Sequence, residues 1–500
     1  MKNLSLTNQR LILLIILFFI LLFNFTSELV AVNNGVGWDG TIYYSVIKDF
    51  DSLITNHGID SYHMTRTLPF VIIHYALEFL GIDVNETTAV LGARVYNFSL
   101  IILLVIYFFK ISKELKWDQK SELIAFSFVF FNFPVLKFFG YNPVSCDCTA
   151  LVLSYMAVYY YLRNNKIAQT FIGLLSLVAW PILSAIIFVL VLFPRNFVEN
   201  INYSDKRQVW IAHILRLTFI TFIPVVSLSF MLIIKYRHPE LDLLYFYEIV
   251  NRGSLSLIIV LLSLLSVSVF YYFSTKILYV NWIGVFKSIL DKHILIPIVL
   301  SGILFATIYS LIGKLGGEAG YSSMGQFLIM LKYPATDVFI FWETPFIYLG
   351  LFFLLVLFCW QDIVSYVREN FGIGYYLLLI LALIFIMDIE TRKLESFYPL
   401  FLIPLIQCLR KKDIKWNVAF MIPIICLILS FFWFHINVPG IEDAFNEHYS
   451  NYWKFPAQRY YMFHGPWQSH LVYFITITAE IAIIFAIWLL YKKGILTSEK

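Results

Sequence analysis

Charged side chains are scarce in this 500-residue sequence, which has only 14% Asp, Glu, Lys and Arg against 60% hydrophobic residues. Soluble domains carry about 25% charged residues, so the shortage excludes a soluble multidomain protein. The net charge is also small, at +4, and offers no basic field for nucleic acid. Five cysteines are too few and too badly placed for a disulfide framework.

The apolar residues are gathered into long runs, and one membrane crossing needs about 20 of them. The first run follows Lys2 and Arg10 and continues to Val32 without an A-x-A-like cleavage site, so we interpret it as an uncleaved first span. We expect an all-α polytopic membrane bundle of about 12–14 helices, with residues 1–500 as a single transmembrane domain. Later spans are expected near 89–109, 122–139, 149–162, 217–234, 255–273, 294–312, 338–360, 373–388, 398–409, 417–435 and 471–491.

The segment 167–193 is long for one crossing and is interrupted by Trp180-Pro181. Basic residues stand at both of its ends, with Arg163 before it and Arg195 after it, and such residues favour the cytoplasmic side. We therefore predict a hairpin of two short helices that turns at the proline inside the protein, because a single crossing would invert everything downstream.

The basic linkers then all fall on the cytoplasmic side, together with both termini. These linkers contain Lys110/Lys113/Lys116/Lys120, Lys276/Lys287/Lys292, Arg410/Lys411/Lys412/Lys415 and Lys492/Lys493. Functional residues are expected in the loops of the opposite side, since binding groups concentrate in loops held by a rigid scaffold. The predicted outer segments are 33–88, 140–148, 235–254, 313–337, 389–397 and 436–470.

Asp39 comes directly after the first apolar run. A carboxylate at the end of a span lies at the membrane surface, where it can hold a divalent metal or accept a proton from a polar substrate. Tyr43 and Tyr44 follow at helical spacing, so 41–53 is expected to form a short helix along the interface, with Lys48 near the headgroups. The alternative is that Asp39 only caps this helix.

A second candidate carboxylate, Asp147, lies in the turn N-P-V-S-C-D-C between two spans. In one interpretation Asp147 starts the following helix as its N-cap. In the other, the first two outer loops meet and bring Asp147 near Asp39.

Basic residues on the outer side oppose the usual charge pattern and so require a partner. Arg392 and Lys393 interrupt two apolar segments there, and Lys235 and Arg237 form a second cluster of this kind. A lipid phosphate is a natural partner, because a guanidinium matches phosphate oxygens in a bidentate fork and lysine adds a point charge. The alternative for both clusters is an internal ion pair with a neighbouring acidic residue.

The last outer loop, 436–470, is rich in aromatic residues. An aromatic belt at the membrane surface explains such rings without a specific role. A substrate lid is the other interpretation, because rings also stack on sugar faces.

The order of these residues resembles the GT-C class of multi-spanning glycosyltransferases that use lipid-phosphate sugars. The class has an acidic residue after the first span, a large outer loop with interfacial helices, and an arginine and a proline before the next span. This sequence departs from many members at Gly40, where they have a second acid, so a divalent cation would need Asp147 or another loop's acid. The matching residues are Asp39, Tyr43-Tyr44, Arg66, Pro69, Ala93-Arg94, Asn97, Tyr141-Asn142-Pro143, Asp147, Glu390-Thr391-Arg392 and Pro399.

The resemblance implies an inverting enzyme that moves a hexose or pentose from a polyprenyl-phosphate carrier to a lipid, glycan or protein acceptor. Asp39 would be the general base, with Asp147 and a Mg²⁺ or Mn²⁺ ion as additional groups. The absence of a glycine-rich phosphate loop fits a lipid-linked donor. The residues expected to bind substrate are Tyr43, Tyr44, Lys48, Arg66, Lys235, Arg237, Arg392 and Lys393.

The expected location is the inner (cytoplasmic) membrane of a bacterium, with the active site on the outer face. Two other functions stay open. A flippase or transporter for a lipid-linked glycan would use the same basic and aromatic cavity without an essential carboxylate. A non-catalytic subunit of envelope assembly would need no such cavity.

Overall fold

The computed structural model describes residues 5–26, 28–30, 32–37, 39–193, 195–237, 257–317, 338–388, 390–430 and 470–492. Over these ranges the chain is all-α, as expected, and its extended segments form only two isolated bridges. The first helices are α1 (Leu6–Thr26), η1 (Val32–Gly35), α2 (Gly40–Thr55), α3 (Ser61–Met64), α4 (Leu68–Phe79), α5 (Glu86–Glu114), α6 (Gln119–Phe130), η2 (Pro134–Phe138), α7 (Phe139–Tyr141), α8 (Asp147–Leu162), α9 (Lys166–Leu177) and α10 (Pro181–Leu192).

The later helices complete the bundle, and the loop predicted at 436–470 lies outside the described residues except for its last one. These helices are α11 (Lys206–Arg237), α12 (Leu257–Ser274), η4 (Thr275–Leu278), α13 (Trp282–Leu290), α14 (Lys292–Leu315), α16 (Ile340–Leu349), α17 (Leu351–Phe358), α18 (Trp360–Asn370), α19 (Ile373–Phe385), η6 (Thr391–Phe397), α20 (Tyr398–Lys411), α21 (Trp416–Leu429) and α23 (His470–Lys492).

Several helices are long and apolar enough to cross a membrane. Among the described residues there are five, or up to seven if each of two bent helix pairs counts as one span. Other apolar helices, such as α19 and α21, are shorter than 18 residues. The five are Leu6–Thr26, Glu86–Glu114, Lys206–Val226, Val260–Leu278 and Lys292–Leu315.

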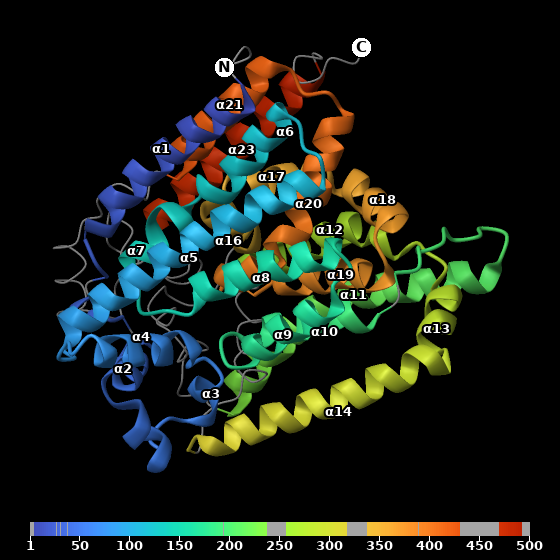
Figure 1. The fold of residues 1–500 in the computed structure, drawn as a ribbon. Coiled ribbons are helices and arrows are strands. Elements are labelled where there is room, and N and C mark those ends of the chain that lie inside the picture. Colours follow the sequence, from blue (N-terminus) through green and yellow to red (C-terminus); the bar gives the residue numbers. More distant parts are fainter. Residues whose placement is uncertain are drawn as a thin grey trace.

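The surfaces of these helices are apolar. Along α1, Leu13 and Leu17 are buried against the bundle, whereas Leu11 and Phe19 are 58% and 63% exposed. α14, which runs along one side of the molecule in Figure 1, has no buried residue. Apolar faces of this length are unfavourable in water and match the tails of lipids, as expected for an integral membrane protein.

Three expected spans are shorter or broken in the structure. The first helix ends at Thr26 rather than continuing to Val32. The span expected at 122–139 bends by 50° where Pro134 begins a π-helical turn, because proline removes a backbone donor. The span expected at 338–360 breaks at Gly350, whose φ of +60° suits glycine. Such breaks and the short loop helices give 21 α-helices among the described residues, more than the 12–14 expected.

The predicted hairpin is confirmed as a local structure. α9 ends at Leu177, α10 begins at Pro181, and the two helices pack along each other. Trp180, between them, has an extended backbone. The Ser184 hydroxyl donates to the Gly173 carbonyl across the pair, at 2.6 Å.

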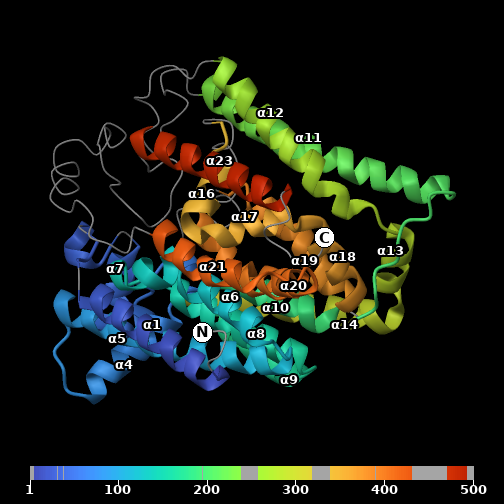
Figure 2. The ribbon, with the colours of Figure 1, turned by 90° about the horizontal axis from the view of Figure 1, so that it is seen from above.

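α8 lies near the centre of the bundle and is buried along most of its length. It packs against α5, α9, α10, α20 and η6, and Figure 2 shows α8 beside α10 and α20. This packing places the start of α8, with Asp147, next to η6, with Arg392. In Figure 1, α2, α3 and α4 lie at the end of the molecule opposite the start of α1 and the end of α23.

Candidate functional site

A small polar cavity lies where four separate parts of the chain meet: the first and second predicted outer loops, the tip of the α9–α10 hairpin, and η6. Its lining includes Asp39, Arg66, Asn142, Trp180, Arg392 and Lys393. The cavity has a volume of about 20 Å³, which is room for about one water molecule.

Asp39 lines this cavity and is half-buried. It occupies the N-cap position of α2, but its side chain makes no capping hydrogen bond. The structure therefore does not show the capping role that was the alternative for this carboxylate.

Gly40, the residue after Asp39, lies where the first two outer loops approach each other closely. A Cβ atom on Gly40 would lie 3.2 Å from a side-chain carbon of Val36 and 3.3 Å from the carbonyl oxygen of Val144. Just before the first loop, the Val30 amide donates to the carbonyl of Tyr141 in the second loop, at 2.9 Å. This close approach leaves little room at position 40 for the second acidic side chain that many GT-C enzymes have.

Asp147 is the first residue of α8 rather than its N-cap, and it is only 1% exposed. Its Oδ2 atom lies 3.6 Å from Nη1 of Arg392, so the two form a buried ion pair. Burial alone would lower the pKa of the Arg392 guanidinium, but Asp147 and Glu390 raise that pKa well above its ordinary value. These carboxylates therefore favour the charged form of Arg392.

Lys393 makes the internal ion pairs that were the alternative to phosphate binding. Its Nζ atom lies 2.6 Å from Asp388 and 2.9 Å from Glu390. Burial alone would lower the pKa of Lys393, but these two carboxylates raise it. Burial alone would raise the pKa of Glu390, but Lys393 and Arg392 lower it. Much of the charge of Lys393 is thus neutralised within the protein.

The guanidinium of Arg66 contacts two aromatic rings. Its guanidinium carbon lies 3.8 Å from the centre of the Tyr62 ring and 5.4 Å from that of Trp180, and both contacts are favourable cation–π interactions. The guanidinium also donates to the Tyr62 carbonyl at 2.7 Å. These contacts fix a buried cation at the edge of the cavity.

Of the remaining residues expected to bind substrate, only Tyr43 lines the cavity among those whose side chains the structure describes. Within α2, Tyr43 and Ile47 face inward one turn apart, and Tyr43 lines the cavity. Tyr44 is half-buried outside the cavity lining, and Lys48 is exposed, as expected for a residue near the headgroups. Lys235 and Arg237 belong to the end of α11, where the side chains are outside the described part of the chain.

Trp180 is the site residue that sequence reasoning missed. The Trp-Pro pair predicted the turn of the hairpin, but nothing in the sequence indicates that this turn reaches the outer loops. The structure shows the connection, because the Leu68 amide donates to the Val178 carbonyl at 2.8 Å.

The donor set does not fit a divalent cation. Over the described residues, no group of three or more His, Cys, Asp and Glu side chains could hold a metal ion. Asp147 faces the Arg392 guanidinium, and Arg66 also lines the cavity, so positive charge is already present. A Mg²⁺ ion held by one or two carboxylates would have to share the cavity with both guanidinium groups, which repel it.

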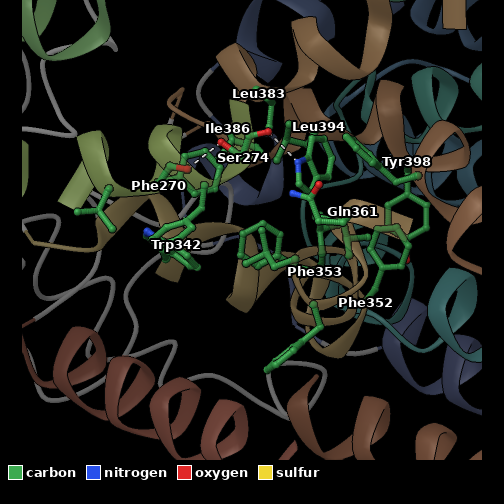
Figure 3. Close-up of a pocket in the computed structure, with 18 residues that line it drawn as sticks. Phe270, Ser274, Trp342, Phe352, Phe353, Gln361, Leu383, Ile386, Leu394 and Tyr398 are labelled. Atoms are coloured by element: carbon green, nitrogen blue, oxygen red, sulfur yellow. Dashed lines mark hydrogen bonds between the residues drawn. The ribbon is translucent and has the colours of Figure 1, made fainter. Parts of the chain in front are cut away.

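A larger apolar cavity adjoins η6, with a volume of about 360 Å³. Figure 3 shows it between α12, α16, α17 and α20, with Phe352, Phe353 and Tyr398 among its walls. Lys393 lines the polar cavity and the next residue, Leu394, lines the apolar one. A cavity of this size and composition is within the range of ligand pockets.

Comparison with known proteins assigns no family to the chain. No protein-family model matches the sequence, and no curated protein or solved structure matches it.

Proposed function

We propose that the protein is a GT-C-type membrane glycosyltransferase that moves a sugar from a polyprenyl-phosphate carrier to an acceptor on the non-cytoplasmic side. The observation that carries this proposal is the meeting of Asp39, Arg66 and Arg392 at one cavity. Asp39 follows the first apolar run, Arg66 precedes the next span, and Arg392 belongs to the basic cluster of the 389–397 loop. Together they supply a base and two phosphate-binding cations.

In the proposed reaction, the Asp39 carboxylate accepts the proton of an acceptor hydroxyl. The acceptor oxygen forms a bond to the anomeric carbon of the donor while the bond from that carbon to the phosphate oxygen breaks. This direct displacement inverts the anomeric centre. The electron pair leaves with the lipid phosphate, whose growing negative charge is stabilised by the guanidinium groups of Arg66 and Arg392.

The apolar cavity supports a lipid-linked donor. It adjoins the segment that carries Arg392, so a prenyl chain in the apolar cavity would bring its phosphate to the polar one. The polar cavity has room for about one water molecule, so sugar binding requires the lining side chains to move apart.

Asp39→Asn tests the proposed base. Losing general-base catalysis lowers the rate by about 10²–10⁴-fold, whereas donor binding should persist because the cations remain. The assay uses purified protein, undecaprenyl phosphate carrying glucose, mannose or arabinose, and a cell-envelope extract as acceptor, and measures the undecaprenyl phosphate released.

The matched control is Asp49→Asn, which removes an exposed carboxylate from the same helix and should leave the rate unchanged. Asparagine caps a helix about as well as aspartate, so a lost cap cannot explain a large effect. Asp39→Asn protein with more than about a tenth of the wild-type rate would remove Asp39 from the chemistry. Wild-type protein that moves the lipid across liposomes without cleaving it would favour the flippase.

A further inference from the structure

We infer that Trp180, at the tip of the α9–α10 hairpin, binds the sugar of the donor through its indole N–H group. This inference rests on the proposed glycosyltransferase function and assigns a sugar-reading residue within that site. Trp180 lies on the cavity with Asp39 and Arg66 and is 4% exposed.

The indole N–H of Trp180 has no hydrogen-bond partner among the described residues. Buried indole groups usually find one. In this protein Trp360 donates to the Ser274 carbonyl at 2.8 Å and Trp282 to the Leu278 carbonyl at 2.7 Å. Trp117 and Trp342, like Trp180, have no partner among the described residues, but only Trp180 of these three lines the polar cavity. A buried donor on a polar cavity that has no protein acceptor is suited to a ligand acceptor.

The cavity lining also includes a residue with a buried hydrogen-bond acceptor that has no partner among the described residues. The side-chain oxygen of Asn142 has no partner within the described part of the chain, and Asn142 is 3% exposed. Sugar hydroxyls both donate and accept, so a sugar in the cavity can satisfy both the amide oxygen of Asn142 and the N–H of Trp180. An ionised phosphate only accepts and would repel the amide oxygen. The pair therefore favours a hydroxyl-bearing group over the phosphate.

Trp180 also contacts the cation assigned to the phosphate. Its ring centre lies 5.4 Å from the Arg66 guanidinium carbon, which also lies 3.8 Å from the centre of the Tyr62 ring. A sugar bonded to Trp180 would thus lie next to the phosphate on Arg66, which is the order of groups in a polyprenyl-phosphate sugar.

The test compares two ligands of the full-length purified protein: undecaprenyl phosphate alone, and undecaprenyl phosphate carrying glucose, mannose or arabinose. Trp180→Phe keeps an aromatic ring beside Arg66 but removes the N–H donor. It should weaken binding of the best sugar-bearing lipid by about three- to tenfold, the effect of one neutral hydrogen bond, and leave binding of bare undecaprenyl phosphate unchanged. Asn142→Ala should show the same selective loss, and it provides an independent measurement if Trp180→Phe does not fold.

The control is Trp117→Phe, which removes another buried indole N–H without a partner among the described residues, in the linker between α5 and α6. It should change neither dissociation constant. Equal weakening of both ligands by Trp180→Phe and Asn142→Ala, or no weakening of either, would overturn the sugar-binding role. Wild-type protein that binds none of these lipids would instead overturn the proposed function.

Discussion

At the scale of single residues, the buried ion pair of Asp147 and Arg392 should be sensitive to the loss of either partner. The two side chains are 1% and 10% exposed. Removing two charges from water costs several kcal/mol per ion. A buried ion pair therefore stabilises a fold no more than well-packed apolar side chains would at the same positions. Loss of one partner is different, because the remaining charge is left buried and uncompensated.

Arg392→Ala should therefore destabilise the protein by about 3–5 kcal/mol and weaken binding of undecaprenyl phosphate. Arg392→Ala combined with Asp147→Asn removes both charges, so it should recover much of the stability without recovering the binding. Thermal unfolding in detergent and lipid binding measure the two effects separately.

Lys412→Ala is the control, because Lys412 pairs with Asp362 at 2.8 Å but both side chains are well exposed, at 31% and 49%. Its expected cost is about 0–1 kcal/mol. If the double variant bound undecaprenyl phosphate as well as the wild type, Arg392 would be a structural residue only.

At the scale of elements, the α9–α10 hairpin positions Trp180. A Cβ atom on Gly173 would lie 3.3 Å from a methyl carbon of Ile187 and within van der Waals reach of Phe188. The two helices can pack this closely because position 173 has no side chain.

Gly173→Leu should separate α9 from α10 and displace the hairpin tip. Overpacking of this kind costs about 1–3 kcal/mol, and affinity for sugar-bearing undecaprenyl phosphate should fall as Trp180 moves. Both are measurable on purified protein by thermal unfolding and lipid binding.

Gly302→Leu on α14 is the matched control, since no atom lies within 4 Å of the position that a Cβ atom on Gly302 would take. Both substitutions raise helix propensity by a similar amount. The difference in stability between the two variants therefore measures the effect of packing between α9 and α10. Equal stability of the two variants would show that the hairpin tolerates separation.

The elements predicted from periodicity alone agree with the structure in part. The short helix expected at 41–53 is confirmed as α2, in which Tyr43 and Ile47 form an apolar stripe one turn apart. The break at Gly350 was missed, because a lone glycine within an apolar run looks like part of a continuous span.

The candidate site was predictable from the sequence only in part. Asp39 and Arg392 stand out in the sequence because polar residues next to spans need partners, whereas Arg66 was expected from the resemblance to the GT-C class. The ion pair of Asp147 with Arg392 and the position of Trp180 depend on how α8, α9 and η6 pack. Local sequence patterns carry no information about such contacts between distant segments.

At the scale of the whole molecule, the distribution of charge predicts an orientation in the membrane. Basic residues in short loops favour the cytoplasmic side, so the linker between α5 and α6 is expected inside and the first outer loop outside. The structure agrees with one requirement of this topology, because the start of α1 and the end of α23 lie at the same end of the molecule, away from α2 to α4. The candidate site adjoins α2 and α3.

Single cysteines in a cysteine-free variant test this orientation. The five natural cysteines are buried. Replacing all five removes every native thiol, so the reagent can label only the introduced cysteine. Thr55→Cys lies at the exposed end of α2 and should react with a membrane-impermeant thiol reagent in intact cells. Lys113→Cys lies at an exposed position near the end of α5. It should react only after the cells are permeabilised, because the basic linker that follows α5 is expected on the cytoplasmic side. The reverse labelling pattern would place the cavity of Asp39 and Arg392 on the cytoplasmic face, where a donor presented on the outer leaflet could not reach it.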